Sequence, residues 1–364
     1  MKIKINSAEL GFFIMGLLLS TSVKASLLYN ITDLTDSYST ITSAISINNY
    51  GQIVGDSSFG ATDTHAFIYS DPNVTDIGTL GGHYSHASFI NDAGQVVGDA
   101  NLANGQNHAF IYSNGNIVDI GTLGGNNSSA SFINAAGQVV GSADLANGQT
   151  HAFSYVNNTL TDLGTLSSAK SYASSINASG HVVGYLDFGN GQTHAFSYVN
   201  NTLTDLGVLG GVNSHASYIN SAGQIAGYYE LSNGNQDAFI YYNGVMTDLG
   251  TLGGLFSFAN GFNDAGQLVG YSTDVDGNDR AFIYSNGVMN DLNSLMATTI
   301  TGLVLNDANG INNSGQIVAN GKINGLTHQF LLTPATIVPL PNAFFIFLSG
   351  LGLLFYKRSG IKRS

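Results

Sequence analysis

A stretch running from Ser88 to Ala100 returns seven times, with small edits, along this chain of 364 residues. The glycine at its centre, which precedes Gln or His, stands at Gly51, Gly94, Gly137, Gly180, Gly223, Gly266 and Gly315. The first five steps between these glycines are 43 residues and the last is 49. Such a period constrains the fold strongly, because each repeat is one structural unit that must bury its apolar surface against its neighbours.

One unit, residues 86–128, holds short apolar runs separated by turn residues. Asp92-Ala93-Gly94 is a tight-turn sequence, and Asn114-Gly115 is the strongest short hairpin signal. No helical periodicity is present. The unit is therefore predicted to contain four antiparallel strands, at residues 87–91, 95–98, 108–112 and 116–120.

The strands are apolar on both faces, as in His108-Ala-Phe-Ile-Tyr112. A sheet of this kind must be covered on both sides, which stacking between two similar sheets achieves. Units of about 40–45 residues with four strands are typical of propeller blades. The sequence therefore predicts an all-β fold, a seven-bladed β-propeller of four-stranded antiparallel blades, with a β-solenoid as the alternative.

The order of strand types predicts how the ring closes. The chain begins with a strand of the fourth type at residues 29–34 and ends with one of the third type at residues 328–332. The last blade then lacks its outer strand, which residues 29–34 would supply. This pairing would leave no open edge between the first and last blades.

The N-terminal residues 1–25 have the pattern of a signal peptide. Lys2 and Lys4 precede the apolar run of residues 10–19, and Ala25 and Ser26 flank the predicted cleavage point. The predicted propeller domain covers residues 26–336.

Residues 337–364 form a predicted sorting signal in three parts. A motif, Val338-Pro339-Leu340-Pro341, is followed by a hydrophobic helix and a basic tail. Residues 337–356 are a stretch of 20 residues without a charge, which is long enough to cross a bilayer. The basic tail that follows would stay in the cytoplasm. This end resembles the PEP-CTERM class of bacterial sorting signals, in its VPLPA variant, with Asn342 in place of the variant's Ala. The resemblance implies processing by an exosortase in a Gram-negative bacterium, after transient anchoring in the inner membrane.

The charge of the chain excludes one class of partner. The formal net charge is -13, and residues 26–338 hold 22 acidic and three basic residues, or -19. Such a surface repels phosphate backbones, so no nucleic-acid partner is expected. The chain has no Cys, so an exported fold must rely on a large core or a closed ring of strands.

Repeated polar residues are interpreted as structural. The histidines of the His-Ala-Phe motif lie one blade apart, too far to share a metal ion, and are interpreted as strand-start residues bonded to a neighbouring loop. An Asp recurring in the fourth strand is expected to accept turn N–H groups in its own blade. An Asn recurring before the central glycine is expected to start an Asx turn. His83 and His86 would form a site in one blade only.

The loop at residues 274–279 differs from its copies. Asp274, Asp276 and Asn278 place alternating oxygen ligands around Gly277, as a Ca²⁺ loop requires. The loop is interpreted as a solvated acidic loop and no cofactor is predicted, with Ca²⁺ at Asp274, Asp276 and Asn278 as the alternative. No catalytic residues stand out from the repeat background, so the chain is predicted not to be an enzyme.

The repeats carry a resemblance of their own. His-Ala-Phe stands at residues 65–67, 108–110, 151–153 and 194–196, and Asp-Leu-Gly-Thr-Leu-Gly-Gly recurs nearby. These motifs resemble the bacterial extracellular repeats of the HAF family, which implies an exported repeat protein and no particular activity. We expect a non-enzymatic protein of the cell surface or extracellular matrix, binding polysaccharide or a surface protein. The alternative is a polysaccharide lyase or hydrolase with its site in the propeller channel.

Overall fold

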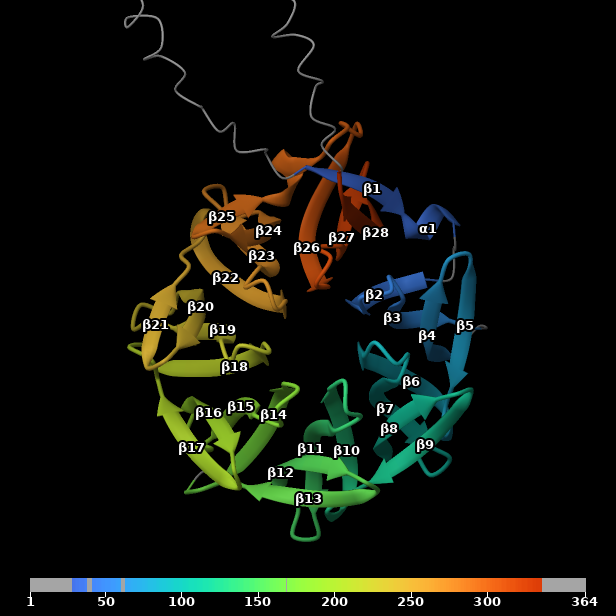
Figure 1. Ribbon diagram of the computed structural model, residues 1–364, viewed down its shortest axis with the longest axis vertical. Helices are drawn as coiled ribbons and strands as arrows, with labels where there is room; N and C mark the ends of the chain where they lie inside the picture. The colour runs from blue at the N-terminus through green and yellow to red at the C-terminus, as the bar shows by residue number, and fades with distance from the viewer. Residues whose placement is uncertain (1–27, 38–40, 60–62, 168, 336–364) are drawn as a thin grey trace, which may run out of the picture. The chain divides into compact units, whose positions relative to one another are not determined.

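The computed structural model describes residues 28–37, 41–59, 63–167 and 169–335 (Figure 1). The predicted signal peptide, its cleavage point at Ala25 and Ser26, and the predicted sorting signal lie outside these residues, as do residues 26, 27 and 336 of the predicted propeller domain. One compact unit spans Leu28–Pro334. Within the described part of the chain, no helix is long and apolar enough to cross a membrane.

The strands fall into four types by their place in the repeat. The inner strands are β2 (Ile41–Ile47), β6 (Gly81–Ile90), β10 (Gly124–Ile133), β14 (Lys170–Ile176), β18 (Asn213–Ile219), β22 (Gly253–Phe262) and β26 (Leu303–Ile311). The second strands are β3 (Ile53–Ser58), β7 (Val96–Leu102), β11 (Val139–Leu145), β15 (Val182–Asp187), β19 (Ile225–Glu230), β23 (Leu268–Asp274) and β27 (Ile317–Ile323).

The third strands are β4 (Thr64–Ser70), β8 (Asn107–Ser113), β12 (Thr150–Val156), β16 (Thr193–Val199), β20 (Gln236–Tyr242), β24 (Asp279–Ser285) and β28 (Leu326–Pro334). The outer strands are β5 (Asn73–Gly78), β9 (Asn116–Gly121), β13 (Thr159–Gly164), β17 (Thr202–Gly207), β21 (Val245–Asp248), β25 (Val288–Asp291) and β1 (Tyr29–Asp33). Two single-turn helices, α1 (Leu34–Ser37) and the 3₁₀ helix η1 (Leu292–Leu295), follow β1 and β25.

In each unit the inner strand pairs antiparallel with the second strand, the second with the third, and the third with the outer strand. Hydrogen bonding joins the strands into five sheets, of which three have four strands and two have eight. Each eight-stranded sheet is two four-stranded units linked by one parallel bridge, Thr64 with Tyr84 or Gln236 with Phe256. The predicted all-β class and four-stranded antiparallel units are confirmed. The seven-bladed count stays a prediction, because hydrogen bonding gives five sheets in the described residues.

The units follow one another around a common centre, and the two ends of the chain close the ring (Figure 1). Strand β1 pairs antiparallel with β28, from Tyr29 opposite Pro334 to Asp33 opposite Phe330. The first and last units also touch directly, because the Asn309 amide donates a 2.6 Å hydrogen bond to the Ala44 carbonyl. The predicted closure by residues 29–34 is therefore present, with α1 beginning at Leu34, and an open solenoid does not describe this arrangement.

The apolar residues of neighbouring units pack together as expected. One core cluster combines Val54 and Ala66 of one unit with Ala87, Ile90 and Phe110 of the next, all nearly fully buried. The Phe of the His-Ala-Phe motif thus fills the space between neighbouring four-stranded units. This packing accounts for strands that are apolar on both faces.

Local turn chemistry also follows the sequence. Asn114 and Gly115 both have positive φ, 52° and 80°, as a tight hairpin turn requires. Gly98 sits opposite a bulge between Ala87 and Phe89, and a Cβ there would collide with the His86 carbonyl oxygen. The last Gly of Gln-Val-Val-Gly is therefore required by close approach of two backbones.

One boundary was predicted wrongly. The inner strand of this unit was predicted at residues 87–91, but β6 already begins at Gly81. Gly81 pairs with Leu102 on β7 before a register shift, so the crossing is short and the inner strand long. Gly81 and Gly82 indicated a loop in the sequence, but in the structure they form the irregular start of strand β6.

Candidate site at the propeller channel

The His-Ala-Phe histidines each bond to the aspartate of the outer strand in the same unit. His108 Nδ1 lies 2.8 Å from the Asp119 carboxylate, and Asp119 also accepts the Gly121 N–H at 2.7 Å. The predicted role of the aspartate is confirmed. The predicted partner of the histidine, a neighbouring loop, is wrong, because the eleven-residue hairpin brings the aspartate opposite it. The pairs are His65–Asp76, His108–Asp119, His151–Asp162, His194–Asp205 and His328–Asp33.

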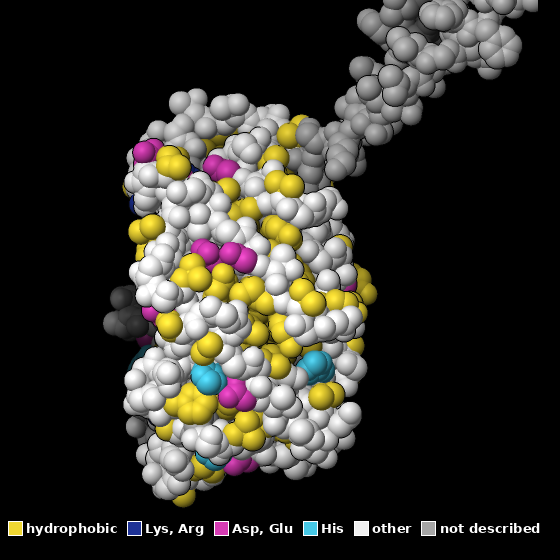
Figure 2. All heavy atoms as spheres, turned by 90° about the vertical axis from the view of Figure 1, so that its left-hand side faces the viewer, with side chains coloured by type: hydrophobic (Ala, Val, Ile, Leu, Met, Phe, Trp, Pro, Cys, Tyr) yellow, Lys and Arg dark blue, Asp and Glu magenta, His cyan; other side chains and the backbone are white. Residues whose placement is uncertain are grey.

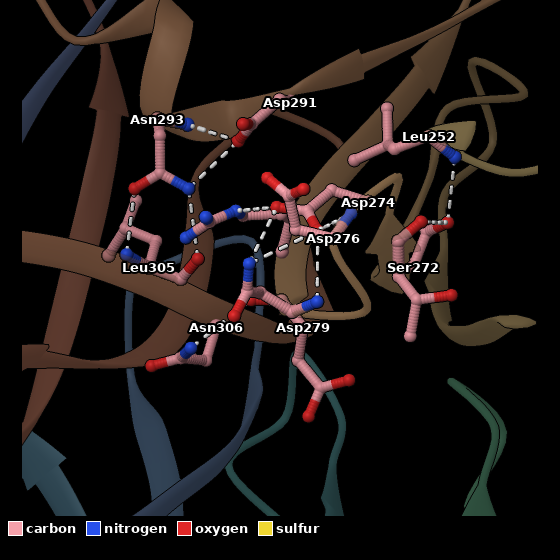
Figure 3. A network of polar contacts seen from close by, with 12 residues as sticks. Leu252, Ser272, Asp274, Asp276, Asp279, Asp291, Asn293, Leu305 and Asn306 are labelled. Atoms are coloured by element: carbon pink, nitrogen blue, oxygen red, sulfur yellow. Dashed lines mark hydrogen bonds and ion pairs between the residues drawn. The ribbon is translucent and has the colours of Figure 1, made fainter. Parts of the chain in front are cut away.

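The predicted calcium loop connects β23 and β24 (Figure 3). Asp274 accepts hydrogen bonds from the backbone N–H groups of Asp276 at 3.0 Å and Asn278 at 2.9 Å, and Arg280 Nε lies 2.9 Å from its carboxylate. The hydrogen bond from the Asn278 backbone N–H is the main cause that holds the pKa of Asp274 below its usual range. Hydrogen bonds from the Asn278 and Arg280 side chains and from the Asp276 backbone N–H act in the same direction. A Ca²⁺ ion would compete with these donors for Asp274.

The described residues contain no group of three His, Cys, Asp or Glu side chains arranged to hold a metal ion. Ca²⁺ at Asp274, Asp276 and Asn278 stays a prediction, to be tested by chelation.

A ring of asparagines surrounds one end of the channel. The Asn91 Oδ1 accepts the N–H groups of Ala93 and Gln95, which confirms the predicted Asx turn, and its Nδ2 donates to the Asn134 carbonyl of the next unit. The same bond runs around the whole ring, through Asn48, Asn91, Asn134, Asn177, Asn220, Asn263 and Asn312, and back to Asn48. The sequence analysis did not predict this link between units. The signal for it was the asparagine that recurs at the same position of every repeat, with an amide group that needs a partner.

A belt of half-buried side chains crosses the inner and second strands, at positions five residues before and eight residues after each ring asparagine. It joins the position of His86 on each inner strand with that of Asp99 on each second strand. The residues at these two positions change in character around the ring. One arc of the belt is polar, with Ser43, Asp56, His86, Asp99, Ser129 and Ser142. The opposite arc holds Tyr172, Tyr185, His215, Tyr228, Phe258 and Tyr271, which we call the aromatic ladder.

The rings of the ladder contact one another in sequence across three units. Centroid separations are 4.8 Å for Tyr172–Tyr185, 4.3 Å for Tyr185–His215, 4.7 Å for His215–Tyr228, and 4.9 Å for both Tyr228–Phe258 and Phe258–Tyr271. Such separations are those of favourable aromatic pairs. The ladder is therefore a continuous strip of ring edges and phenol groups.

The ladder is uncharged at neutral pH. Burial raises the pKa of Tyr185 to about 12 and that of Tyr271 to about 12, with smaller contributions from nearby acidic groups and phenols. Burial also lowers the pKa of His215 to about 4. Phenol O–H groups on this strip are thus available as hydrogen-bond donors.

The polar arc behaves differently at the same repeat position. His86 Nδ1 lies 2.9 Å from Asp56, and Ser129 Oγ donates to Asp99 at 3.1 Å. Burial lowers the pKa of His86, but its hydrogen bond to Asp56 and the charges of Asp56 and Asp99 raise that pKa overall. One arc is thus neutral and aromatic, and the other is hydrogen-bonded and ionic.

Two cavities meet at the ladder. A channel cavity of about 390 Å³ is lined by Tyr228 and Phe258 together with Ser88, Ser131, Ser174 and Ser217 of the inner strands. Serines of four inner strands therefore line the channel.

A second, open pocket of about 480 Å³, lined by residues of three consecutive units, lies at the end of the ladder, and we call it the end pocket. Its lining is Gln236, Phe256, Phe258, Tyr271, Asp279, Asn306, Asp307 and Asn320. Asp307 accepts a 2.7 Å hydrogen bond from the Asn260 amide, and burial raises its pKa to about 6.

The surface around this arc carries few basic groups. On the side of the molecule shown in Figure 2, acidic and hydrophobic side chains stand among polar ones, and basic side chains are almost absent from view. This agrees with the three basic residues between positions 26 and 338.

Comparison with known proteins finds likeness in structure only. No family profile matches the chain, and no curated protein matches it in sequence. A puromycin-hydrolyzing peptidase from Mycobacterium tuberculosis aligns with a TM-score of 0.55 at 10% identity, over 82% of this chain and 51% of that one. TolB from Acinetobacter baumannii aligns with a TM-score of 0.46 at 14% identity, over 78% of this chain and 63% of that one.

A lectin from Aleuria aurantia aligns with a TM-score of 0.36 at 11% identity, over 86% of this chain and 97% of that one. The chain thus spans between half and two thirds of the peptidase and TolB chains, and identities this low concern the fold alone. The closed ring of four-stranded antiparallel units defines the chain as a β-propeller protein.

Proposed function

We propose that this protein is an exported, surface-anchored or matrix-associated propeller that binds polysaccharide without cleaving it. The observation that carries the proposal is the aromatic ladder, an unbroken run of contacting rings at two repeat positions that are polar on the other arc of the ring. Departure from the repeat on one arc therefore marks a surface with a task of its own.

The chemistry of the ladder suits a sugar chain. Its rings pack against one another, so a ligand would meet ring edges and the hydroxyl groups of Tyr172, Tyr185, Tyr228 and Tyr271. A row of neutral donors beside apolar edges matches the alternating hydroxyl and C–H groups of a polysaccharide. The acidic body favours neutral or cationic chains over anionic ones.

Export and sorting complete the proposal. The signal peptide, the sorting motif at Val338-Pro339-Leu340-Pro341 and the HAF-like repeats support placement at the cell surface, with an exosortase as processing partner. Terminal mass spectrometry of the protein from its native host tests this placement. Export followed by sorting would give a chain that starts near Ser26 and lacks residues 357–364. Retention of those last residues after export would indicate a simple membrane anchor.

Binding to a panel of immobilised polysaccharides tests the ligand class. The protein should bind at least one neutral or cationic polysaccharide, and Tyr228→Ala should weaken that binding about tenfold, as expected for a central aromatic contact. Tyr242→Ala, which removes an exposed ring outside the ladder, is the matched control and should bind normally. Failure to bind any polysaccharide, or equal loss in both variants, would contradict the proposal.

A specific observation favours one alternative, a polysaccharide-cleaving enzyme. The Asp307 carboxyl group lies near Asp279 and Tyr271, and burial raises its pKa to about 6. A carboxyl group with a raised pKa has the property required of a glycosidase proton donor. Release of reducing ends from a bound polysaccharide, abolished by Asp307→Asn, would establish this alternative. Binding without such release supports the non-enzymatic function.

A further inference from the structure

We propose that the end pocket binds the protonated amino group of an amino-sugar unit within a polysaccharide chain. This inference rests on the proposed function, because it places one unit of the ligand beyond the end of the aromatic ladder. The ladder residues Phe258 and Tyr271 belong to both surfaces, so a chain lying along the ladder leads into the pocket.

The lining of the end pocket combines the two groups that recognise an ammonium ion. Asp307 and Asp279 supply carboxylates, and Phe258 and Tyr271 supply aromatic rings. Carboxylates bind ammonium through charge-assisted hydrogen bonds, and aromatic rings attract cations within about 6 Å. Asn306, Asn320 and Gln236 add amides that can hold the hydroxyl groups of the same sugar.

The carboxylate of Asp307 has no cationic partner of its own. Among the described residues, no Lys, Arg or His forms an ion pair with it, and Arg280 is engaged by Asp274. Its contacts are the Asn260 amide and the Ala308 N–H, and Asp279 adds a like charge. Elsewhere in the belt the buried carboxylate of Asp56 has His86 as its partner. A half-buried, uncompensated carboxylate is costly, and a ligand ammonium would remove that cost.

The two carboxylates also explain why a neutral N-acetylated sugar would bind less well. An acetamido group cannot satisfy the charge of Asp307, and its methyl group would displace water from Asp279 without replacing the lost hydrogen bonds. The end pocket therefore discriminates between free and acetylated amines on the same sugar.

Calorimetric titration with glucosamine oligomers and with N-acetylglucosamine oligomers of equal length tests the inference. The intact protein should bind the amine oligomer at least tenfold more tightly at low ionic strength. Asp307→Asn should lose about tenfold in affinity for the amine oligomer and keep its affinity for the acetylated one. Asp71→Asn, which removes an exposed carboxylate between β4 and β5, outside the pocket, is the control of equal charge and should bind normally.

A pH titration of wild-type binding keeps the inference falsifiable if Asp307→Asn fails to fold. The titratable groups near Asp307 are Asp279, Tyr271 and Tyr218, and burial raises the pKa of both phenols to about 12. Protonation of Asp307 between pH 7 and pH 5 should weaken amine binding about tenfold, although the oligomer itself gains charge over that range.

Each contrary result has a distinct meaning. Equal affinity for both oligomers, or no loss in Asp307→Asn, overturns the inference and leaves the proposed function standing. Equal binding of an oligolysine of the same charge overturns the sugar assignment. Binding of neither oligomer, nor of any other polysaccharide, overturns the proposed function itself. Cleavage of the amine oligomer assigns Asp307 to the enzymatic alternative.

Discussion

Two histidines at one repeat position show how strongly a residue depends on its neighbours. His86 faces Asp56, whereas His215 lies between the rings of Tyr185 and Tyr228, with its Nε2 2.8 Å from Thr193 Oγ1. The carboxylate raises the pKa of the first, and burial lowers that of the second to about 4. The ladder therefore depends on His215 being neutral.

His215 should make stability fall in mild acid. Its folded pKa, about 4, lies below the unfolded value of about 6.5, so below pH 6.5 the unfolded chain binds more protons than the folded one. The contribution of His215 to the free energy of unfolding is fully present above pH 6.5. It is lost as pH falls toward 4, which lowers the free energy of unfolding by about 1–2 kcal/mol after allowance for solvent exposure. His215→Phe should flatten the dependence of Tm on pH in this window. Tyr185→Phe, a ladder variant without a titration there, should keep it.

Calcium binding to the loop at residues 274–279 gives a second residue-level prediction. If Asp274, Asp276 and Asn278 hold Ca²⁺, a chelator should lower Tm, and Asp276→Ala should remove that sensitivity. Arg280→Gln frees one oxygen of Asp274 and should strengthen Ca²⁺ binding. Melting curves that a chelator leaves unchanged in both the wild type and Arg280→Gln would rule the site out.

At the scale of the element, a buried serine connects neighbouring units at five junctions. Ser128 at the inner strand β10 donates a 2.6 Å hydrogen bond to the Gly121 carbonyl of β9 and accepts the Ala109 N–H of β8 at 2.8 Å. Equivalent bonds are made by Ser85, Ser171, Ser214 and Ser257.

Ser128→Ala should lower the free energy of unfolding by about 1–3 kcal/mol, because it leaves a buried N–H and a buried carbonyl without partners. Ser131→Ala is the matched control, since Ser131 lines the channel cavity, and it should change stability by less than about 0.5 kcal/mol. Urea unfolding measures both. Equal effects of the two substitutions would show that Ser128 does not link the units.

The repeat made the strand types, their order and their turns predictable, because each signal is local and occurs many times. Asn114-Gly115 and the Asx turn at Asn91 needed only neighbouring residues. The bonds of Ser128 and the amide of Asn91 could not be predicted in this way, since their partners lie on other strands or other units. The ladder was missed because the copies were interpreted as equivalent. Comparing the inner strands column by column would have exposed Tyr172, His215 and Phe258.

At the scale of the whole molecule, the ring depends on its first strand. Strand β1 completes the last unit, and His328 Nδ1 lies 2.7 Å from Asp33, as in the pairs formed within single units. Without β1, strand β28 would present an unpaired edge, which favours association with other chains.

Deleting residues 28–35 should therefore lower Tm and promote aggregation, through loss of a strand in a unit about 300 residues away in sequence. A chain with residues 29–33 replaced by Gly and Ser at constant length separates loss of the strand from shortening of the chain, and should behave like the deletion. Differential scanning calorimetry and light scattering provide the measurements. A deletion variant that melts like the parent and remains monomeric would contradict closure by β1.

The pairing of β1 with β28 also sets the order of events during synthesis. The first strand to leave the ribosome must wait for the last, because its partner spans Leu326–Pro334. Contacts between such distant segments form slowly, whereas each hairpin can form as soon as its own residues are available. The middle of the ring can thus assemble while translation continues, and the complete circle exists only once the final repeat has been made.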